Sequence, residues 1–498
     1  MDKEKPCLVI EKIGSNIDKL LIEKKYENLN TYITQIEASL STYTPSESVY
    51  IYYYLGTGKS ALAYNFDKLK KTNQKESAIS FKELSLTYMR KALEEYINTN
   101  CANTTLLLSI YTNYANLLES CGRVIEALNI YRKAILLDDK FAMSIGNYGR
   151  VLNLYAGIVN DFHHCNVLHR YAYQAMKKAV ALKDINLHKE AREYFNNIIS
   201  TYDAMVLDNL LSAKPVFDKY RWEDSEERSY RLWCLRNHLF LNPLNDVIEQ
   251  KSAFAHDPLT ITRFTEPINQ NNVDPQKEMT PPKWFSMLNQ LKEEYIYARF
   301  LCYEGSQKMG QLHYADKDVL LSNADYNYTN YSIRLEQLRS AFKILYSIFD
   351  QIGFFINEFW QLGYSERQAD AANVFRREKN NKYPTDNIAL TALRWEYCEF
   401  KEDFGDNKEL KLLRNALEHK FVKIQEYDYY DHCELGDDSF YHISEDKFIK
   451  HVLRLLALSR EGSMELVYAI DIEERKNGKK EGTTVNLDIN SFDDEWKI

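Results

Sequence analysis

Residues that form tight turns are scarce in this chain. Its 498 residues include only 16 Gly and 10 Pro, against 37 Tyr. An all-β fold needs many tight turns, and glycine and proline are among the residues that turns use most. We therefore expect an all-α fold of long, rarely interrupted helices, whose packed faces carry tyrosine rings.

Three further features are lacking. The formal net charge is -9, which argues against a broad basic surface for nonspecific binding to duplex nucleic acid. The eight cysteines include no CxxC pair, as expected of reduced thiols in a cytosol. No stretch approaches the ~20 apolar residues of a membrane span, and the start of the chain does not resemble a signal peptide. We expect a cytoplasmic protein that does not enter the membrane.

The first half of the chain carries a repeat pattern. Residues 108–141 follow the two-helix pattern of about 34 residues typical of TPR units, with Gly122 at the turn. The helix-contact positions hold small and aromatic residues: Tyr111, Tyr114, Ala115, Leu118, Ala127, Tyr131 and Ala134. Degenerate units precede and follow it. The pattern resembles TPR repeats and implies a TPR-like array over residues 1–225, whose concave surface would hold a protein or peptide partner.

Two motifs in this half could suggest other chemistry. Gly56-Thr57-Gly58-Lys59-Ser60 resembles part of a phosphate-binding loop, but Tyr53 stands where that motif requires its first glycine. His163-His164-Cys165 offers metal ligands, whereas zinc sites usually pair two separated ligand couples. We interpret the first motif as part of a repeat and the second as an inserted loop. We expect no metal and no cofactor.

The second half predicts a helical bundle. A capping segment and polar connector fill residues 226–282, the bundle spans 283–475, and a polar tail covers 476–498. Helices are predicted at 283–305, 325–362, 386–401, 407–426 and 444–473. The second of these carries apolar residues at spacings of three and four, which predicts one buried stripe. Beyond Met464 the pattern fits either a helix to about Arg475 or a hairpin, and we favour the helix.

The strongest functional signal is the hexapeptide Arg414-Asn415-Ala416-Leu417-Glu418-His419. On a helix, Asn415 and His419 share a face, and Arg414 lies about 100° to the side of Asn415. A histidine can move protons while an arginine binds phosphate oxygens with two hydrogen bonds, which together support RNA cleavage without a metal. The simpler interpretation is a surface ion pair between Arg414 and Glu418, with His419 solvated.

This hexapeptide resembles the Arg-polar-(x)n-His signature of the HEPN superfamily. Its extension through residues 420–424 resembles a HEPN branch that is attached to TPR repeats. The resemblance implies a HEPN-type helical bundle and a homodimer in which two motifs face each other across one composite site. It also implies roles for the residues: His419 as general acid or base, Arg414 as the group that stabilises the phosphate, and Asn415 as the group that orients it. Glu418 would tune His419 or pair with Arg414.

These observations lead to one functional expectation and its alternatives. We expect a metal-independent endoribonuclease, resembling toxins and defence effectors, that cleaves an RNA such as a tRNA or mRNA loop and is controlled by the TPR-like region. The alternative is a non-catalytic scaffold or a nucleotide-binding interaction protein; an ATP-driven signalling enzyme is a weaker third. Arg299 and Glu304, on the first bundle helix, could reach the site, but a buried ion pair between helices is the preferred interpretation.

Overall fold

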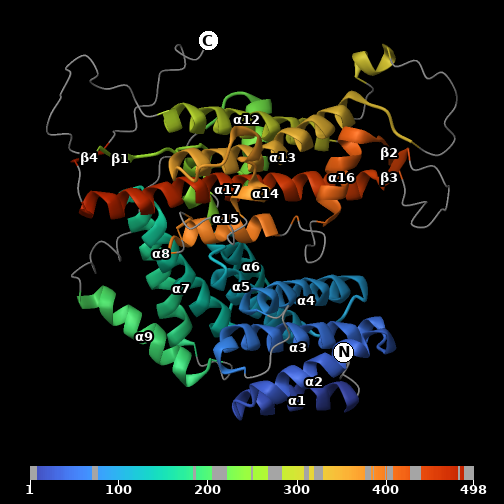
Figure 1. The fold of residues 1–498 in the computed structure, drawn as a ribbon, viewed down its shortest axis with the longest axis vertical. Helices are drawn as coiled ribbons and strands as arrows, with labels where there is room; N and C mark the ends of the chain where they lie inside the picture. Colours follow the sequence, from blue (N-terminus) through green and yellow to red (C-terminus); the bar gives the residue numbers. More distant parts are fainter. Residues whose placement is uncertain are drawn as a thin grey trace. The chain divides into compact units, whose positions relative to one another are not determined.

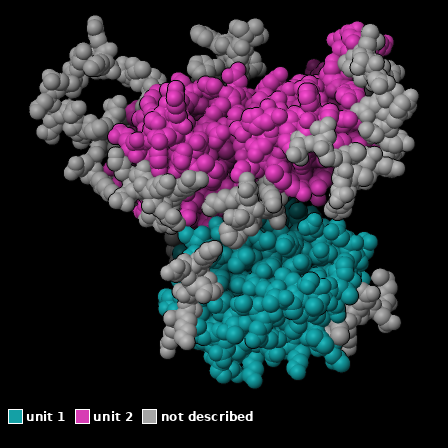
Figure 2. Space-filling model, turned by 45° about the vertical axis from the view of Figure 1, so that its right-hand side comes forward, with its two compact units in different colours: residues 1–157, 165–214, 402–406 teal, residues 158–164, 215–401, 407–498 magenta. Residues whose placement is uncertain are grey.

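The computed structural model divides the chain into two compact units (Figure 2). Unit 1 comprises residues 1–157, 165–214 and 402–406, and unit 2 comprises residues 158–164, 215–401 and 407–498. The structure describes residues 8–69, 77–182, 187–204, 221–247, 251–266, 283–307, 313–318, 329–375, 383–384, 386–398, 400, 408–426, 439–480 and 483–486. The described part of the chain is almost entirely helical, so the predicted all-α class is confirmed.

Unit 1 is built from consecutive helices (Figure 1). They are α1 (Leu8–Ile22), α2 (Tyr26–Ala38), α3 (Pro45–Tyr64), α4 (Ala78–Asn98), α5 (Thr104–Ser120), α6 (Val124–Leu137), α7 (Ala142–Ile158), α8 (Phe162–Ala181) and α9 (Lys189–Ala204), with short 3-10 turns η1 (Leu40–Thr42) and η2 (Phe66–Lys68). The start of α3 illustrates how the sequence sets these bounds. Thr44 and Glu47 form a reciprocal capping box, and Pro45 occupies the first helical turn.

The clearest predicted repeat coincides with a helix pair. Helices α5 and α6 are joined by a turn in which Gly122 has φ 81°, a conformation that favours glycine. The side chains predicted to lie at helix contacts are nearly all buried: Tyr114, Ala115, Leu118, Ala127, Tyr131 and Ala134. The helical hairpin is therefore present. The assignment of unit 1 to TPR repeats stays a prediction.

Unit 2 is a bundle around three long helices. Its helices are α11 (Ser225–Arg236), α12 (Lys283–Ser306), α13 (Ile333–Phe359), α14 (Ala371–Val374), α15 (Ile388–Cys398), α16 (Lys408–His419) and α17 (Glu445–Lys480). Short 3-10 turns are η3 (Pro243–Asp246), η4 (Ser252–Phe254), η5 (Tyr314–Asp318) and η6 (Glu366–Gln368). Helix α13 packs against both α12 and α17 (Figure 1), and its predicted apolar stripe is buried from Leu335 to Ile356.

Within the described residues, four short strands flank this bundle. Strands β1 (Arg263–Glu266) and β4 (Thr483–Asn486) pair antiparallel, while β2 (Phe421–Gln425) and β3 (Phe440–Ser444) pair in parallel. The prediction of one helix over 407–426 is therefore wrong beyond His419. Residues 421–425 adopt a strand because a partner strand 19 residues later, with Phe421 opposite Phe440, satisfies their backbone groups.

The other predicted helix bounds need smaller corrections. Helix α17 continues past Arg475 to Lys480, so the helical alternative is confirmed there and the first residues of the predicted tail are helical. The polar connector, predicted as an irregular surface segment, contains the strand β1. Residues 267–282 and 487–498, which hold the rest of the predicted connector and tail, lie outside the described residues.

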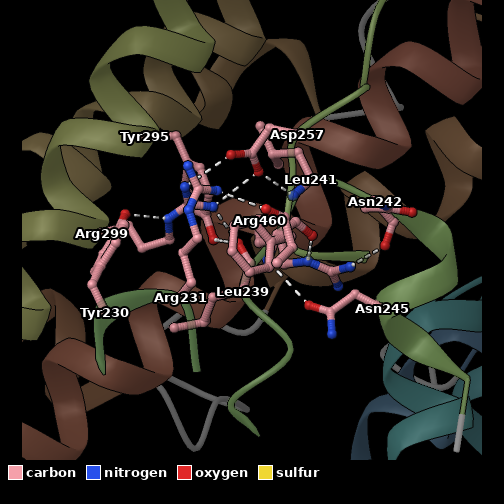
Figure 3. A network of polar contacts seen from close by, with 12 residues as sticks. Tyr230, Arg231, Leu239, Leu241, Asn242, Asn245, Asp257, Tyr295, Arg299 and Arg460 are labelled. Atoms are coloured by element: carbon pink, nitrogen blue, oxygen red, sulfur yellow. Dashed lines mark hydrogen bonds and ion pairs between the residues drawn. The ribbon is translucent and has the colours of Figure 1, made fainter. Parts of the chain in front are cut away.

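A buried arginine anchors the segment that precedes the connector (Figure 3). From α12, Arg299 makes two hydrogen bonds to the Asp257 carboxylate, at 2.9 and 2.8 Å. It also donates to the Leu239 carbonyl at 3.0 Å and to the Tyr230 hydroxyl at 2.9 Å. The predicted buried ion pair exists, but its acid comes from an irregular segment and not from another bundle helix.

A second buried arginine holds the same segment from α17. Arg460 pairs with Asp246 at 2.8 Å, and both side chains are almost completely buried. The same guanidinium donates to the carbonyl groups of Phe240, at 2.6 Å, and Asn242, at 3.1 Å. The two arginines therefore attach Leu239, Phe240, Asn242, Asp246 and Asp257 to the bundle.

Candidate functional site

The Arg414–His419 hexapeptide forms the last turns of α16. Leu410, Leu413 and Ala416 recur every three residues on this helix and are buried, where α16 packs against α13. This packing leaves the neighbouring face, with Arg414 and His419, toward solvent. The chain then leaves the helix at Lys420, whose N–H donates to the Ala416 carbonyl at 2.8 Å, and enters β2.

Arg414 is held on several sides. Its guanidinium carbon lies 5.5 Å from the ring centroid of Tyr346, a residue of α13. Its Nη1 donates to the Asn415 side-chain oxygen at 3.2 Å and lies 3.0 Å from a carboxylate oxygen of Glu418. The side chain is one-third exposed. These contacts restrict a flexible side chain to one orientation before any ligand arrives.

His419 is much more open to solvent. Its side chain is 71% exposed, and its Nε2 lies 3.8 Å from the Glu418 carboxylate. Glu418 thus stands between the arginine and the histidine. All of the predicted site residues, namely Arg414, Asn415, Glu418 and His419, are brought together on one accessible face of α16. The surface ion pair of the simpler interpretation is also present.

Helix α13 contributes two side chains that sequence reasoning missed. Burial raises the pKa of the Tyr346 hydroxyl to about 12, and the nearby Asp350 carboxylate adds to this shift. Partial desolvation raises the pKa of the Asp350 carboxyl, and the charge of Arg414 partly offsets this effect. Tyr346 and Asp350 are four residues apart on α13, beside its buried apolar stripe, and no local sequence pattern linked them to Arg414.

A second pair of a histidine and a carboxylate lies at the other end of α16. Glu409 contacts His451 at 2.9 Å and Lys447 at 3.3 Å, both on α17. The hydrogen bond from His451 and the charge of Lys447 lower the pKa of the Glu409 carboxyl to about 2. This pair ties α16 to α17 and thereby fixes the helix that carries Arg414.

The two motifs set aside in the first half have other roles. The segment Gly56–Ser60 lies within α3, where the buried Lys59 pairs with Glu37 at 3.1 Å, so it forms no phosphate-binding loop. Residues 163–165 lie in the first turns of α8, and the expectation of an inserted loop was wrong there. Among the described residues, no group of three His, Cys, Asp or Glu side chains has the geometry to hold a metal ion.

Most of the second unit resembles a known protein family. Residues 275–473 match the family model of LA2681-like HEPN domains. This segment is therefore similar to HEPN domains. It contains α12 to α16 and most of α17, and with them the whole Arg414–His419 face. No curated protein and no solved structure matches the chain.

Over the residues that the structure describes, each helix is either too short or too polar to cross a bilayer.

Proposed function

We propose that the chain is a metal-independent endoribonuclease whose active site is built on α16. The observation that carries this proposal is the constrained guanidinium of Arg414 beside the exposed imidazole of His419, on one face of a HEPN-like domain. A positioned cation and a side chain that can give and take a proton are the two groups that cleavage of RNA by its own 2'-hydroxyl requires.

The reaction follows from these groups. The 2'-oxygen attacks the adjacent phosphorus, and the bond from phosphorus to the 5'-oxygen breaks. The products are a 2',3'-cyclic phosphate and a free 5'-hydroxyl. His419 takes the proton from the 2'-hydroxyl or gives one to the departing oxygen, and Arg414 stabilises the extra charge on the phosphate oxygens. Asn415 orients the same phosphate, and Glu418 holds Arg414 until the substrate replaces it.

A complete site would combine two copies of α16. One histidine performs one of the two proton transfers, so a second histidine from a facing copy would supply the other. We therefore propose a homodimer formed through the HEPN-like domain. Unit 1 would bind the protein or peptide partner that controls cleavage, because stacked helical pairs present extended surfaces for such partners. The target would be a cytoplasmic RNA, and uncontrolled cleavage would make the protein a toxin or defence effector.

One observation favours a different function. The Arg414 and Glu418 side chains already neutralise each other at 3.0 Å, so the pair needs no substrate to be satisfied. A non-catalytic scaffold, or a domain that binds a nucleotide without cleaving it, would also retain this arrangement. The two functions differ in what happens to RNA when His419 is removed.

The experiment is induction of the wild type, Arg414→Ala and His419→Ala in a bacterial host, with growth followed and new RNA 5' ends sequenced. We expect growth arrest and discrete cuts with the wild type alone, since loss of a general acid or base lowers the rate by roughly 10²- to 10⁴-fold. His313→Ala, at a histidine beside the separate turn η5, is the matched control and should remain active. Equal behaviour of all four folded proteins would support the scaffold.

A further inference from the structure

A small aromatic surface follows directly after the proposed site. The parallel register places Phe421 opposite Phe440 and Lys423 opposite His442. Successive side chains of a strand alternate between its two faces, so these four share one face. We refer to Phe421, Lys423, Phe440 and His442 as the β2–β3 platform.

Exposure in this sheet falls along both strands, from their first residues to their last. Ile424 and Ile443 point to the other face and are almost completely buried. On the platform, the Phe421 side chain is 72% exposed and its ring centroid lies 5.8 Å from that of Phe440. The Lys423 ammonium lies 4.5 Å from the centre of the Phe440 ring. The exposed ring offers a flat surface for stacking and the ammonium beside it attracts negative charge, a combination that fits a flat, anionic ligand.

The platform is fixed relative to α16. Phe421 follows His419 by two residues, and its N–H donates to the Ser439 carbonyl at 3.0 Å. The opposite edge of β2 is held by α13 and the residues before it, since Arg339 donates to the Val422 carbonyl at 3.0 Å and the Asn330 N–H to that of Ile424 at 2.8 Å. The ring of Phe421 is therefore presented from a strand that is anchored on both sides.

We propose that the β2–β3 platform stacks an unpaired base next to the phosphate that Arg414 contacts, so that the substrate class is single-stranded RNA. This inference rests on the proposed ribonuclease function. Aromatic rings bind single strands by stacking on bases of any sequence, and adjacent cations bind the backbone. Lys420 and Lys423 supply such cations locally in a chain of net charge -9. A paired base keeps both faces covered by its neighbours and cannot stack on Phe421 in this way.

The test measures binding separately from cleavage. A fluorescein-labelled 2'-O-methyl oligouridine lacks the attacking hydroxyl, so its anisotropy reports binding alone. We expect Phe421→Leu to weaken binding about 5- to 150-fold, the range that loss of one stacked base produces. Phe421→Trp should bind close to wild type, because it keeps a ring. Tyr297→Ala, at an exposed aromatic residue of α12, is the matched control.

The outcomes separate the two proposals. Equal binding by Phe421→Leu and the wild type, no binding by the wild type, or tighter binding of an oligouridine–oligoadenine duplex would overturn the platform. If unmodified RNA is cleaved while Phe421→Leu binds normally, the platform fails and the ribonuclease stands. If binding depends on the Phe421 ring but no variant cleaves RNA, the platform stands and the proposed cleavage fails.

Discussion

Replacement of Arg299 by methionine should destabilise unit 2 more than most single substitutions. Methionine keeps much of the apolar stem but removes the guanidinium, which pairs with Asp257 while its own side chain is only 3% exposed. The substitution leaves the Asp257 carboxylate enclosed and without its cation. It also removes the donor to the Tyr230 hydroxyl and one of two donors to the Leu239 carbonyl, which keeps the hydrogen bond from the Tyr295 hydroxyl.

The magnitude follows from this geometry. Breaking a buried ion pair by removing one partner costs roughly 3–5 kcal/mol, because the remaining charge stays desolvated. The companion variant Asp257→Asn removes that charge. In the Asp257→Asn protein, Arg299→Met should lower the free energy of unfolding clearly less than it does in the wild type. The difference between the two losses is the coupling energy of the pair.

The effect should also depend on pH. Burial by itself raises the pKa of the Asp257 carboxyl, but the charge and hydrogen bonds of Arg299, with the Leu241 N–H and the charge of Lys292, outweigh it and lower the pKa overall. Arg299 supplies the two largest effects that lower this pKa, so in its absence we expect burial to prevail and the pKa to rise above the unfolded value of about 4. An Asp with a raised pKa favours the folded state only at low pH. The destabilisation by Arg299→Met should therefore be large at neutral pH and shrink as the pH falls toward 4.

Tryptophan fluorescence is the appropriate assay. All six tryptophans, from Trp222 to Trp496, belong to unit 2, so urea unfolding followed at this signal reports that unit. A loss of less than about 1 kcal/mol at neutral pH, below the range for a broken buried pair, would refute the reasoning. An equal loss of unfolding free energy from Arg299→Met in the wild type and in the Asp257→Asn protein would refute it as well.

Three further predictions concern other contacts. As the pH falls from 4.5, the ordinary pKa of Glu409, toward about 2, the free energy of unfolding should decline by about 1–2 kcal/mol, after allowance for solvent screening. In acid titrations, Glu409→Gln should flatten this decline. Gly353→Ala should cost about 1–3 kcal/mol in urea unfolding, because the added methyl group would lie 2.6 Å from the Ala371 backbone nitrogen. Tyr346→Leu should slow RNA cleavage about 2- to 30-fold by removing the ring under Arg414, whereas Tyr346→Phe keeps the ring and should cleave normally.

Local periodicity predicted the helices well. The stripe from Leu335 to Ile356 has a helical repeat, and burial of α13 follows from that pattern alone. The proximity of Arg414, Asn415 and His419 was predictable for the same reason. These residues lie within two turns of one helix, so their mutual geometry depends only on α16 being helical.

Contacts between distant segments were not predictable in this way. Arg460 and Asp246 are 214 residues apart, and nothing in the neighbourhood of either identifies the other. Strand β2 was missed because its five residues directly follow α16 and continue the apolar pattern of that helix. The partner strand, β3, follows only after 14 intervening residues, from Glu426 to Ser439. Tyr346 and Asp350 were missed as neighbours of Arg414 because they depend on how α16 packs across α13.

The most direct test of the account is cleavage of a single-stranded RNA by the purified protein in the presence of EDTA, with the product ends identified chemically. The account predicts 2',3'-cyclic phosphate and 5'-hydroxyl ends, and a loss of roughly 100-fold or more in rate for both Arg414→Ala and His419→Ala. Cleavage that requires a divalent metal, or that persists unchanged in the folded His419→Ala protein, would contradict it.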